Sequence, residues 1–350
     1  MKKYKNSAKI ALGLLISIGF LFLAFRQLDF QQMKQAFSLA KYWLLLPCLI
    51  IIFASHWLRS LRWQFLLNPI KKIPVGNLFS ALLIGYAANT ILPAHLGEFV
   101  RAYVIGRKRA ISVSSALATI VVERIIDILS IVLIMAFTLV IYPFPAWVKK
   151  SGYIMFAFAI GLFVFLILMK VYTEATLKFI RVILRPFPQS IKEKVENLSR
   201  SFLDGLKPMK SKFDYVIIFV LSIMIWLCYW GVIYINFYTF NLAAEYNLGV
   251  IAGLVLLVIT TISVVVPSSP GYIGTYHWLC QVSLELFHVP RAVGLTYALV
   301  VHAINFFPVF IVGFILAWKE GIKLSQVQKD EKYRQAEQEK LAAYEFKLQD

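Results

Sequence analysis

The chain has 350 residues, of which 60% are hydrophobic and 15% are charged, and its formal net charge is +18. Soluble domains are nearer half apolar and a quarter charged, so this composition excludes an ordinary soluble domain and indicates an all-α polytopic membrane protein. The basic residues lie between long apolar runs. Membrane orientation and anionic lipid therefore explain the charge better than nucleic acid, and we expect no nucleic-acid partner.

The three cysteines, Cys48, Cys228 and Cys280, all lie in apolar runs. Their spacing matches no metal or redox motif, and the sequence contains no P-loop, dinucleotide fingerprint, zinc motif or nucleophile elbow. We therefore expect no metal, no cofactor and no soluble catalytic domain.

Membrane-spanning helices need ~20 predominantly apolar residues. Six segments qualify as full spans: Ile10–Phe25, Trp43–Leu58, Val113–Tyr142, Gly152–Met169, Tyr215–Phe240 and Val293–Trp318. The first follows a basic stretch as a signal sequence does, but it lacks a small-residue cleavage site, so we expect an uncleaved helix. Two further apolar segments, Leu78–Arg101 and Leu248–His288, are interrupted by Pro and Gly.

The distribution of Lys and Arg predicts how the interrupted segments lie. Most basic residues fall in the segments 1–9, 59–77, 101–109, 170–212 and 319–350. If both interrupted segments re-enter on their own side, all of these lie in the cytoplasm, as the positive-inside rule requires. We therefore predict six spans, two re-entrant segments, and cytoplasmic N- and C-termini in the inner cell membrane.

Re-entry from opposite sides predicts an inverted-topology repeat, an architecture of many alternating-access transporters. The two breaks echo each other, since Pro93-Ala-His-Leu-Gly97 matches Pro270-Gly-Tyr-Ile-Gly274. The amphipathic linker is expected to lie in the cytoplasmic interface. The predicted organisation is a transmembrane domain over 1–318, with repeat one at about 43–170, the linker at 171–212 and repeat two at about 213–318, followed by a charged tail over 319–350.

The first break combines Pro93 and Gly97 with three polar residues, Asn89, Glu98 and Arg101. Pro removes an amide donor and Gly tolerates left-handed backbone, so an ordinary helix end is one interpretation. Freed backbone groups are costly in lipid, which favours a break that faces water or protein. Under that hypothesis Pro93 and Gly97 are hinges and the polar residues bind substrate.

Glu123, Arg124 and Asp127 fall near the middle of a predicted span. Arg124 would lie ~16 Å deep at 1.5 Å per residue. Helical spacing places the three side chains together, where they partly neutralise each other and leave a net charge of about minus one that Arg101 would balance. Two hypotheses stay open: an ion pair that docks helices, or the wall of a polar cavity that receives a headgroup.

Arg59 and Arg62 come at the predicted end of the second span, beside Trp63. They are typical of interfacial anchoring, and the alternative is a contact to a lipid phosphate, for which guanidinium geometry is suited. Arg62 is therefore a candidate substrate-binding residue.

The second break contains two prolines and two glycines, which exclude a continuous helix. Its predicted hinge positions are Pro267, Pro270, Gly271 and Gly274. Backbone amides together with Ser268 and Ser269 would hydrogen-bond a phosphate or sugar, or would satisfy one another, and both interpretations stay open.

Three polar residues of the second repeat complete the candidate site. His277 follows the break, and His302 and Asn305 align with Arg124 and Asp127 of the first repeat. The histidines are expected to act as neutral hydrogen-bonding groups, with proton coupling as the alternative.

Four segments of the chain carry a resemblance to a known family. They are LRW at 61–63, NTILPAHLGEFVRAYVIGRK at 89–108, VERIID at 122–127 and PSSPGYIG at 267–274. Over roughly residues 10–318 the chain resembles the lysylphosphatidylglycerol synthase transmembrane domain family, also called flippase-like membrane proteins. The resemblance implies a lipid-translocating or lipid-handling protein of the inner membrane. We expect the soluble synthase domain to be missing, so lysyl transfer is not implied.

Two positions depart from the family pattern. His277 stands where the family usually carries an acid, and His302 stands where it often carries Arg. Both departures reduce the fixed charge at the second break and leave the substrate open.

The sequence as a whole predicts a flippase-like protein that translocates or handles a polar phospho- or glycolipid. Arg62, Arg101 and Arg124 would pair with the lipid phosphate, and carboxylates would position them. The alternatives are an intramembrane transferase for lipid- or polyprenyl-linked substrates, with Glu98 or Asp127 as base, and a proton-coupled small-solute transporter. Expected partners are anionic or polyprenyl-linked membrane lipids, and a second copy of the chain or a lipid-modifying enzyme stays open as protein partner.

Overall fold

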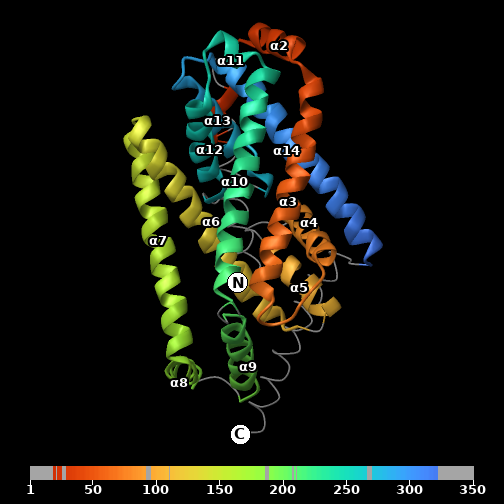
Figure 1. Ribbon diagram of the computed structural model, residues 1–350, viewed down its shortest axis with the longest axis vertical. Coiled ribbons are helices and arrows are strands. Elements are labelled where there is room, and N and C mark those ends of the chain that lie inside the picture. The colour runs from red at the N-terminus through yellow and green to blue at the C-terminus, as the bar shows by residue number, and fades with distance from the viewer. Residues whose placement is uncertain are drawn as a thin grey trace.

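The described part of the chain is helical, with no strand among its residues (Figure 1). The computed structural model describes residues 19–20, 22–25, 29–91, 96–109, 111–185, 189–206, 209, 211–265 and 270–321.

Five helices are long and apolar enough to cross a membrane. These are α3 (Leu45–Leu67, with the 3₁₀ turn η1 over Tyr42–Leu44 before it), α6 (Val113–Ile141), α7 (Ala146–Val171), α10 (Lys212–Thr239) and α14 (Arg291–Lys319). They correspond to five of the six predicted spans. The first predicted span, Ile10–Phe25, lies mostly outside the described residues, so the total of six stays a prediction.

The bundle has two distinct ends, which short helices mark (Figure 1). One end carries α2 (Phe30–Leu39) and α11 (Leu242–Glu245), and there the Lys41 amide donates to the Thr239 carbonyl at 2.8 Å. The other end carries α8 (Thr173–Ile183) and α9 (Gln189–Gly205). The long helices alternate in direction between the α2/α11 end and the α8/α9 end.

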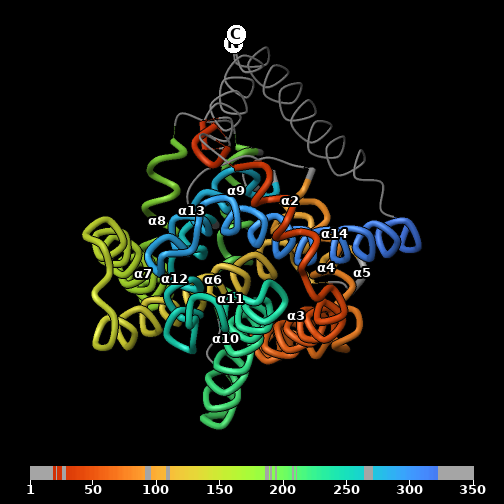
Figure 2. Tube along the Cα trace, turned by 90° about the horizontal axis from the view of Figure 1, so that it is seen from above, coloured from red at the N-terminus to blue at the C-terminus, as the bar shows by residue number. Residues whose placement is uncertain are grey.

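The helices α8 and α9 occupy the predicted amphipathic linker. They attach to the ends of neighbouring long helices: Ser115 Oγ of α6 donates to the Ser201 carbonyl at 2.6 Å, and Lys170 Nζ of α7 donates to the Leu203 carbonyl at 2.8 Å. Figure 2 shows α7 at the outer edge of the bundle, where its apolar side chains face outward.

The first predicted break separates α4 (Val75–Ile91) from α5 (Gly97–Arg109). The two helices pack side by side as a hairpin that starts and finishes at the α8/α9 end (Figure 1). The Gly97 amide donates to Asn89 Oδ1 at 2.7 Å, and a Cβ on Gly97 would lie 2.0 Å from the Gly85 carbonyl oxygen. Only glycine fits there, so Gly97 permits the close approach that folds the hairpin. Pro93 lies outside the described residues.

The second predicted break separates α12 (Val250–Val265) from α13 (Thr275–Glu285), with the 3₁₀ turn η2 (Pro270–Tyr272) between them. This hairpin starts and finishes at the α2/α11 end, opposite to the first (Figure 1). Gly271 and Gly274 have φ values of 72° and 91°, which glycine adopts without steric cost. Pro267, Ser268 and Ser269 lie outside the described residues.

Both interruptions are therefore present where the Pro and Gly pattern predicts them, and the hairpins point into the bundle from opposite ends. This is the arrangement that an inverted repeat requires. Re-entry with respect to a bilayer and the repeat boundaries stay predictions. The two halves pack closely, since a Cβ on Gly313 of α14 would lie 2.2 Å from the Leu83 carbonyl oxygen of α4.

Candidate functional site

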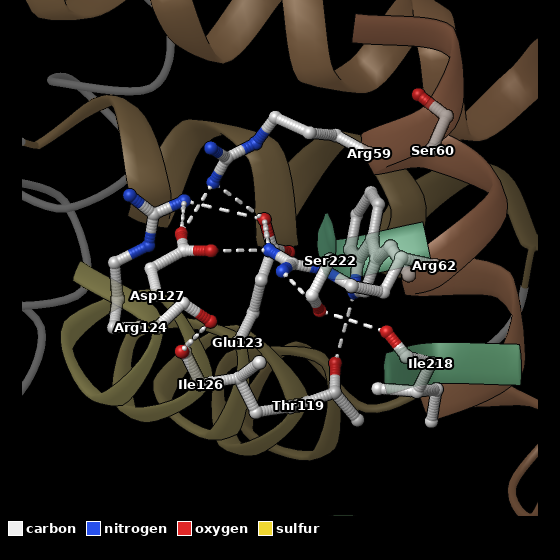
Figure 3. A network of polar contacts seen from close by, with 12 residues as sticks. Arg59, Ser60, Arg62, Thr119, Glu123, Arg124, Ile126, Asp127, Ile218 and Ser222 are labelled. Carbon is white, nitrogen blue, oxygen red and sulfur yellow. Dashed lines mark hydrogen bonds and ion pairs between the residues drawn. The ribbon is translucent and has the colours of Figure 1, made fainter. Parts of the chain in front are cut away.

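Seven charged side chains from three helices meet inside the bundle, and we call them the charged network. Figure 3 shows its members Arg59, Arg62, Glu123, Arg124 and Asp127. Helix α3 supplies two arginines, α5 supplies an acid and an arginine, and α6 supplies two acids and an arginine. They are Arg59, Arg62, Glu98, Arg101, Glu123, Arg124 and Asp127. Each helix carries a pair of these residues three or four positions apart on one face, and on α6 Arg124 also directly follows Glu123, so the helix period gathers most of them.

Glu123 is the centre of the charged network and is fully buried. Its Oε1 accepts from Arg59 Nη2 at 2.8 Å and from Arg124 Nη2 at 3.2 Å, and its Oε2 accepts from Arg101 Nη2 at 2.8 Å. Three charge-assisted hydrogen bonds on one carboxylate join α3, α5 and α6 at a single point.

Asp127 binds the two arginines of α3. Its Oδ1 accepts from Arg62 Nη2 at 2.6 Å and its Oδ2 accepts from Arg59 Nη2 at 2.7 Å. The Nη1 groups of these arginines reach α10, where Arg62 Nη1 donates to Ser222 Oγ at 3.0 Å and Arg59 Nη1 donates to the Tyr229 hydroxyl at 2.9 Å. The second half of the chain is thereby tied to the charges of the first.

Arg101 is held from a second side by an aromatic ring. Its guanidinium carbon lies 3.6 Å from the ring centroid of Trp63, within cation–π range. Trp63 Nε1 in turn donates to Thr119 Oγ1 of α6 at 3.0 Å. Charge pairing and aromatic stacking therefore fix one orientation of Arg101.

The charged network has a sealed side and an accessible side. On the sealed side the side chains of Arg62 and Glu123 are 0% exposed. On the accessible side the Arg124 side chain is 34% exposed, and Glu98 beside it is 19% exposed. Glu98 Oε1 lies 3.7 Å from Arg124 Nε and Glu98 Oε2 lies 3.9 Å from Arg101 Nη1, beyond hydrogen-bond distance. Arg124 and Glu98 are therefore the least covered of the charged side chains in contact with Glu123 and Arg101.

Three uncharged polar side chains lie around the charged network. His56 is on α3, one turn before Arg59, and its ring centroid lies 5.0 Å from that of Tyr86 on α4. Tyr272 lies in the turn η2 of the second break, and this turn contacts α4. Elements of both hairpins therefore meet in this region of the bundle.

The second break forms a separate histidine cluster. The rings of His277 and His302 lie 4.8 Å apart, and His302 Nε2 is 2.8 Å from the Gly271 carbonyl oxygen. The Gly274 amide donates to His277 Nδ1 at 3.2 Å. Both histidines therefore hold the backbone of the turn.

The structure brings together the predicted substrate-binding residues Arg62, Glu98, Arg101, Glu123, Arg124 and Asp127. It assigns other local partners to the rest that it describes: Asn89 caps α5, His277 and His302 hold the turn η2, and Asn305 Nδ2 donates to the Val301 carbonyl of its own helix at 2.8 Å. Of the predicted hinges, Gly97, Pro270, Gly271 and Gly274 lie at the breaks.

The interfacial interpretation of Arg59 and Arg62 is wrong. Helix α3 continues to Leu67 rather than ending at Leu58, and both arginines are buried against Glu123 and Asp127. The predicted charge balance changes with them, because the charged network holds four arginines and three carboxylates. The spacing of Arg59 and Arg62, three residues apart on one helix face, was the signal that pairs them with α6.

The surrounding residues Tyr86, Tyr229 and Tyr272 were not predicted. A tyrosine in an apolar helix resembles any other large apolar residue in sequence, so no pattern distinguishes these three. Only the position of Tyr272, directly after the Pro-Gly pair of the second break, could have indicated it from the sequence.

Comparison with known proteins supports the resemblance. The chain is 22% identical over 245 residues to a UPF0104 membrane protein of Methanocaldococcus jannaschii, covering 70% of this chain and 99% of that protein. It is 24% identical over 284 residues to a UPF0104 membrane protein of Methanothermobacter thermautotrophicus, covering 77% of this chain and 82% of that protein.

A shorter match links the chain to a larger protein. It is 31% identical over 123 residues to the glycosyltransferase AglD of Haloferax volcanii, covering 35% of this chain and 20% of AglD. No solved structure matches. Residues 10–313 match the family described as lysylphosphatidylglycerol synthase TM region, and the chain, a multi-pass integral membrane protein, belongs to that family.

Proposed function

We propose that this protein moves the polar headgroup of a phosphate-bearing lipid across the bilayer. The observation that carries the proposal is the charged network, whose accessible side presents Arg124 beside Glu98 of the first hairpin, in a bundle that two hairpins enter from opposite ends (Figure 1). Ionisable groups are costly within a membrane and usually mark a polar pathway. A pathway that reaches them from either end suits a headgroup that changes sides.

The carboxylates favour translocation over catalysis. Both oxygens of Asp127 already accept hydrogen bonds from guanidinium groups, as do both oxygens of Glu123. A general base needs an oxygen that can take a proton from the substrate. Glu98 is the more loosely held acid, so a transferase would depend on it as its base. A Glu98→Gln variant therefore distinguishes the two classes. A transferase would lose all product formation, whereas a translocator would keep lipid movement because Arg124 is still present.

The direct test reconstitutes the purified protein in liposomes and follows headgroup accessibility on the outer leaflet. We expect wild-type protein to change the accessibility of a labelled lipid without altering its chemistry. Arg124→Gln should slow this movement at least tenfold, because it removes a charged hydrogen-bond donor worth ~1.5–3 kcal/mol. Arg181→Gln, at an exposed ion pair on α8, is the matched control and should leave the rate unchanged.

Each rival gives its own result in the same liposomes. A new lipid species would support the transferase, and loss of a proton gradient without lipid movement would support the small-solute transporter. Wild-type movement by well-folded Arg124→Gln protein would remove Arg124 from the site. We further propose that the α8/α9 end faces the cytoplasm in the inner cell membrane, as the basic residues of that end favour.

A further inference from the structure

The charge of the network restricts which headgroup it accepts. It contains one guanidinium group more than it has carboxylates, so it carries one uncompensated positive charge. Buried charge is stable only when it is paired. A bound anion would complete the pairing, whereas a cationic headgroup would add to the excess.

The hydrogen-bond donors point to the same ligand charge. Arg59, Arg62 and Arg101 are at least nine-tenths buried, and the Nε of each has no hydrogen-bond partner within the described residues. The Nε of Arg124 has none either. A guanidinium group has five donors and no acceptor, and phosphate oxygens are the acceptors that match its geometry. Arg124 is the arginine that a phosphate would contact, because its side chain is the most exposed of the four.

Beside this phosphate position lie groups that suit hydroxyls. Tyr86 of α4 and Tyr272 of the turn η2 come from different hairpins, and α4 and η2 contact each other. The ring of His56 packs against Tyr86 at 5.0 Å. A phenol hydroxyl both donates and accepts hydrogen bonds, as glycerol and sugar hydroxyls do. The neighbouring acid, Glu98, lies 3.9 Å from Arg101 and 3.7 Å from Arg124, so two guanidinium groups already balance its charge against an amine.

The backbone at Tyr272 argues that its side chain is needed there. Its φ is 57°, a left-handed conformation that is rare for a bulky residue. Gly271 before it has φ 72°, and His302 holds its carbonyl at 2.8 Å. Glycine at 272 would relieve this strain, so the strained tyrosine indicates a role for the side chain.

We infer that the accessible side of the charged network selects an anionic phosphate headgroup with a neutral, hydroxyl-bearing substituent. Arg124 takes the phosphate, and Tyr86 and Tyr272 contact the hydroxyls. This inference rests on the proposed function and adds the substrate class to it. Two lipids present this chemistry, a glycerol-bearing phospholipid and a polyprenyl phosphosugar, and cationic aminoacylated lipid is excluded.

The test measures binding to the detergent-solubilised full chain by native mass spectrometry, separately from movement in liposomes. The probes are phosphatidylglycerol, a polyprenyl phosphosugar, phosphatidic acid, which has no hydroxyl-bearing substituent, and lysyl-phosphatidylglycerol, which is cationic. We expect at least one of the first two to bind about tenfold tighter than the cationic lipid, a difference of ~1.4 kcal/mol. The one that binds more tightly identifies the source of the headgroup.

The variants Tyr86→Phe and Tyr272→Phe remove only a hydroxyl. Each should reduce the preference for the hydroxyl-bearing lipid over phosphatidic acid about fivefold, the loss expected for one hydrogen bond. Tyr153→Phe, on the outward face of α7, is the control and should keep the full preference.

Equal binding of the cationic lipid, or an unchanged preference in both tyrosine variants, would overturn the inference. The proposed function fails differently. Selective binding without transbilayer movement would contradict translocation and leave the substrate class intact. Movement of every headgroup at one rate would support translocation and contradict the substrate class.

Discussion

The α4–α5 hairpin and the α12–α13 hairpin share a shape and differ in the side chains at their breaks. At the first break Glu98 and Arg101 join a fixed array of charges, and glycine allows two backbones to touch. At the second break His277 and His302 hold a left-handed turn and bring no fixed charge. The comparison shows that the first hairpin adds fixed charge to the centre of the bundle, whereas the second adds an uncharged turn held by histidines.

The largest effect should come from the centre of the charged network. Glu123→Gln removes the charge that pairs the arginines of three helices, and breaking a buried ion pair costs ~3–5 kcal/mol. We expect a large fall in the thermal unfolding temperature in detergent. Glu196→Gln, an acid of α9 paired with Arg181 and Arg200 near the surface, should change it little. Equal stability of the two variants would show that the network is not held together by Glu123.

The second-largest loss of stability is expected where α4 and α5 approach each other closely. Gly97→Ala places a Cβ 2.0 Å from the Gly85 carbonyl oxygen, and this backbone contact cannot move aside without opening the hairpin. Overpacking of this kind costs ~1–3 kcal/mol. The matched control is Gly161→Ala in α7, where nothing lies within 4 Å. A wild-type unfolding temperature for Gly97→Ala would mean that the first hairpin adjusts as easily as the second.

A substitution in the turn of the second hairpin should destabilise the protein less than the substitution at Gly97. Gly271→Ala meets the ring edge of Phe306, a side chain that can shift, and adds the cost of a left-handed alanine, ~1 kcal/mol. We expect a smaller loss of stability than for Gly97→Ala, with a measurable loss of translocation. Gly231→Ala in α10, with open space around it, controls for helix propensity. A larger destabilisation than at Gly97 would reverse the comparison.

The smallest effect is expected at the histidine cluster. His302→Phe removes the hydrogen bond to the Gly271 carbonyl, a loss of ~1 kcal/mol. Amide hydrogen exchange should rise over residues 270–285 and stay unchanged over 97–109. Increased exchange in both hairpins would mean that the second break also supports the charged network.

The breaks were predictable from sequence because Pro and Gly act locally. Gly97, Gly271 and Gly274 change the backbone wherever they stand, so their positions predicted both interruptions. Glu123, Arg124 and Asp127 were predictable as a group because one helix carries them at helical spacing.

The complete site was not predictable because it depends on packing between helices. Hydropathy drops at Arg59 and Arg62, which suggested that the span ended at Leu58, yet α3 continues because Glu123 and Asp127 pair with both arginines. Tyr86 and Tyr272 lie far apart in sequence, and only the contact of α4 with the turn η2 brings their elements together.

Photocrosslinking inside the site tests the central claim, that the accessible side of the charged network receives a lipid headgroup. The photoreactive amino acid p-benzoylphenylalanine replaces Tyr272 in protein embedded in bilayers that contain a headgroup-labelled anionic lipid. We predict a labelled adduct at this position that falls about tenfold when Arg124→Gln is added, as expected for the loss of ~1.4 kcal/mol of binding. An adduct of equal yield with and without Arg124, or no adduct at all, would contradict the account.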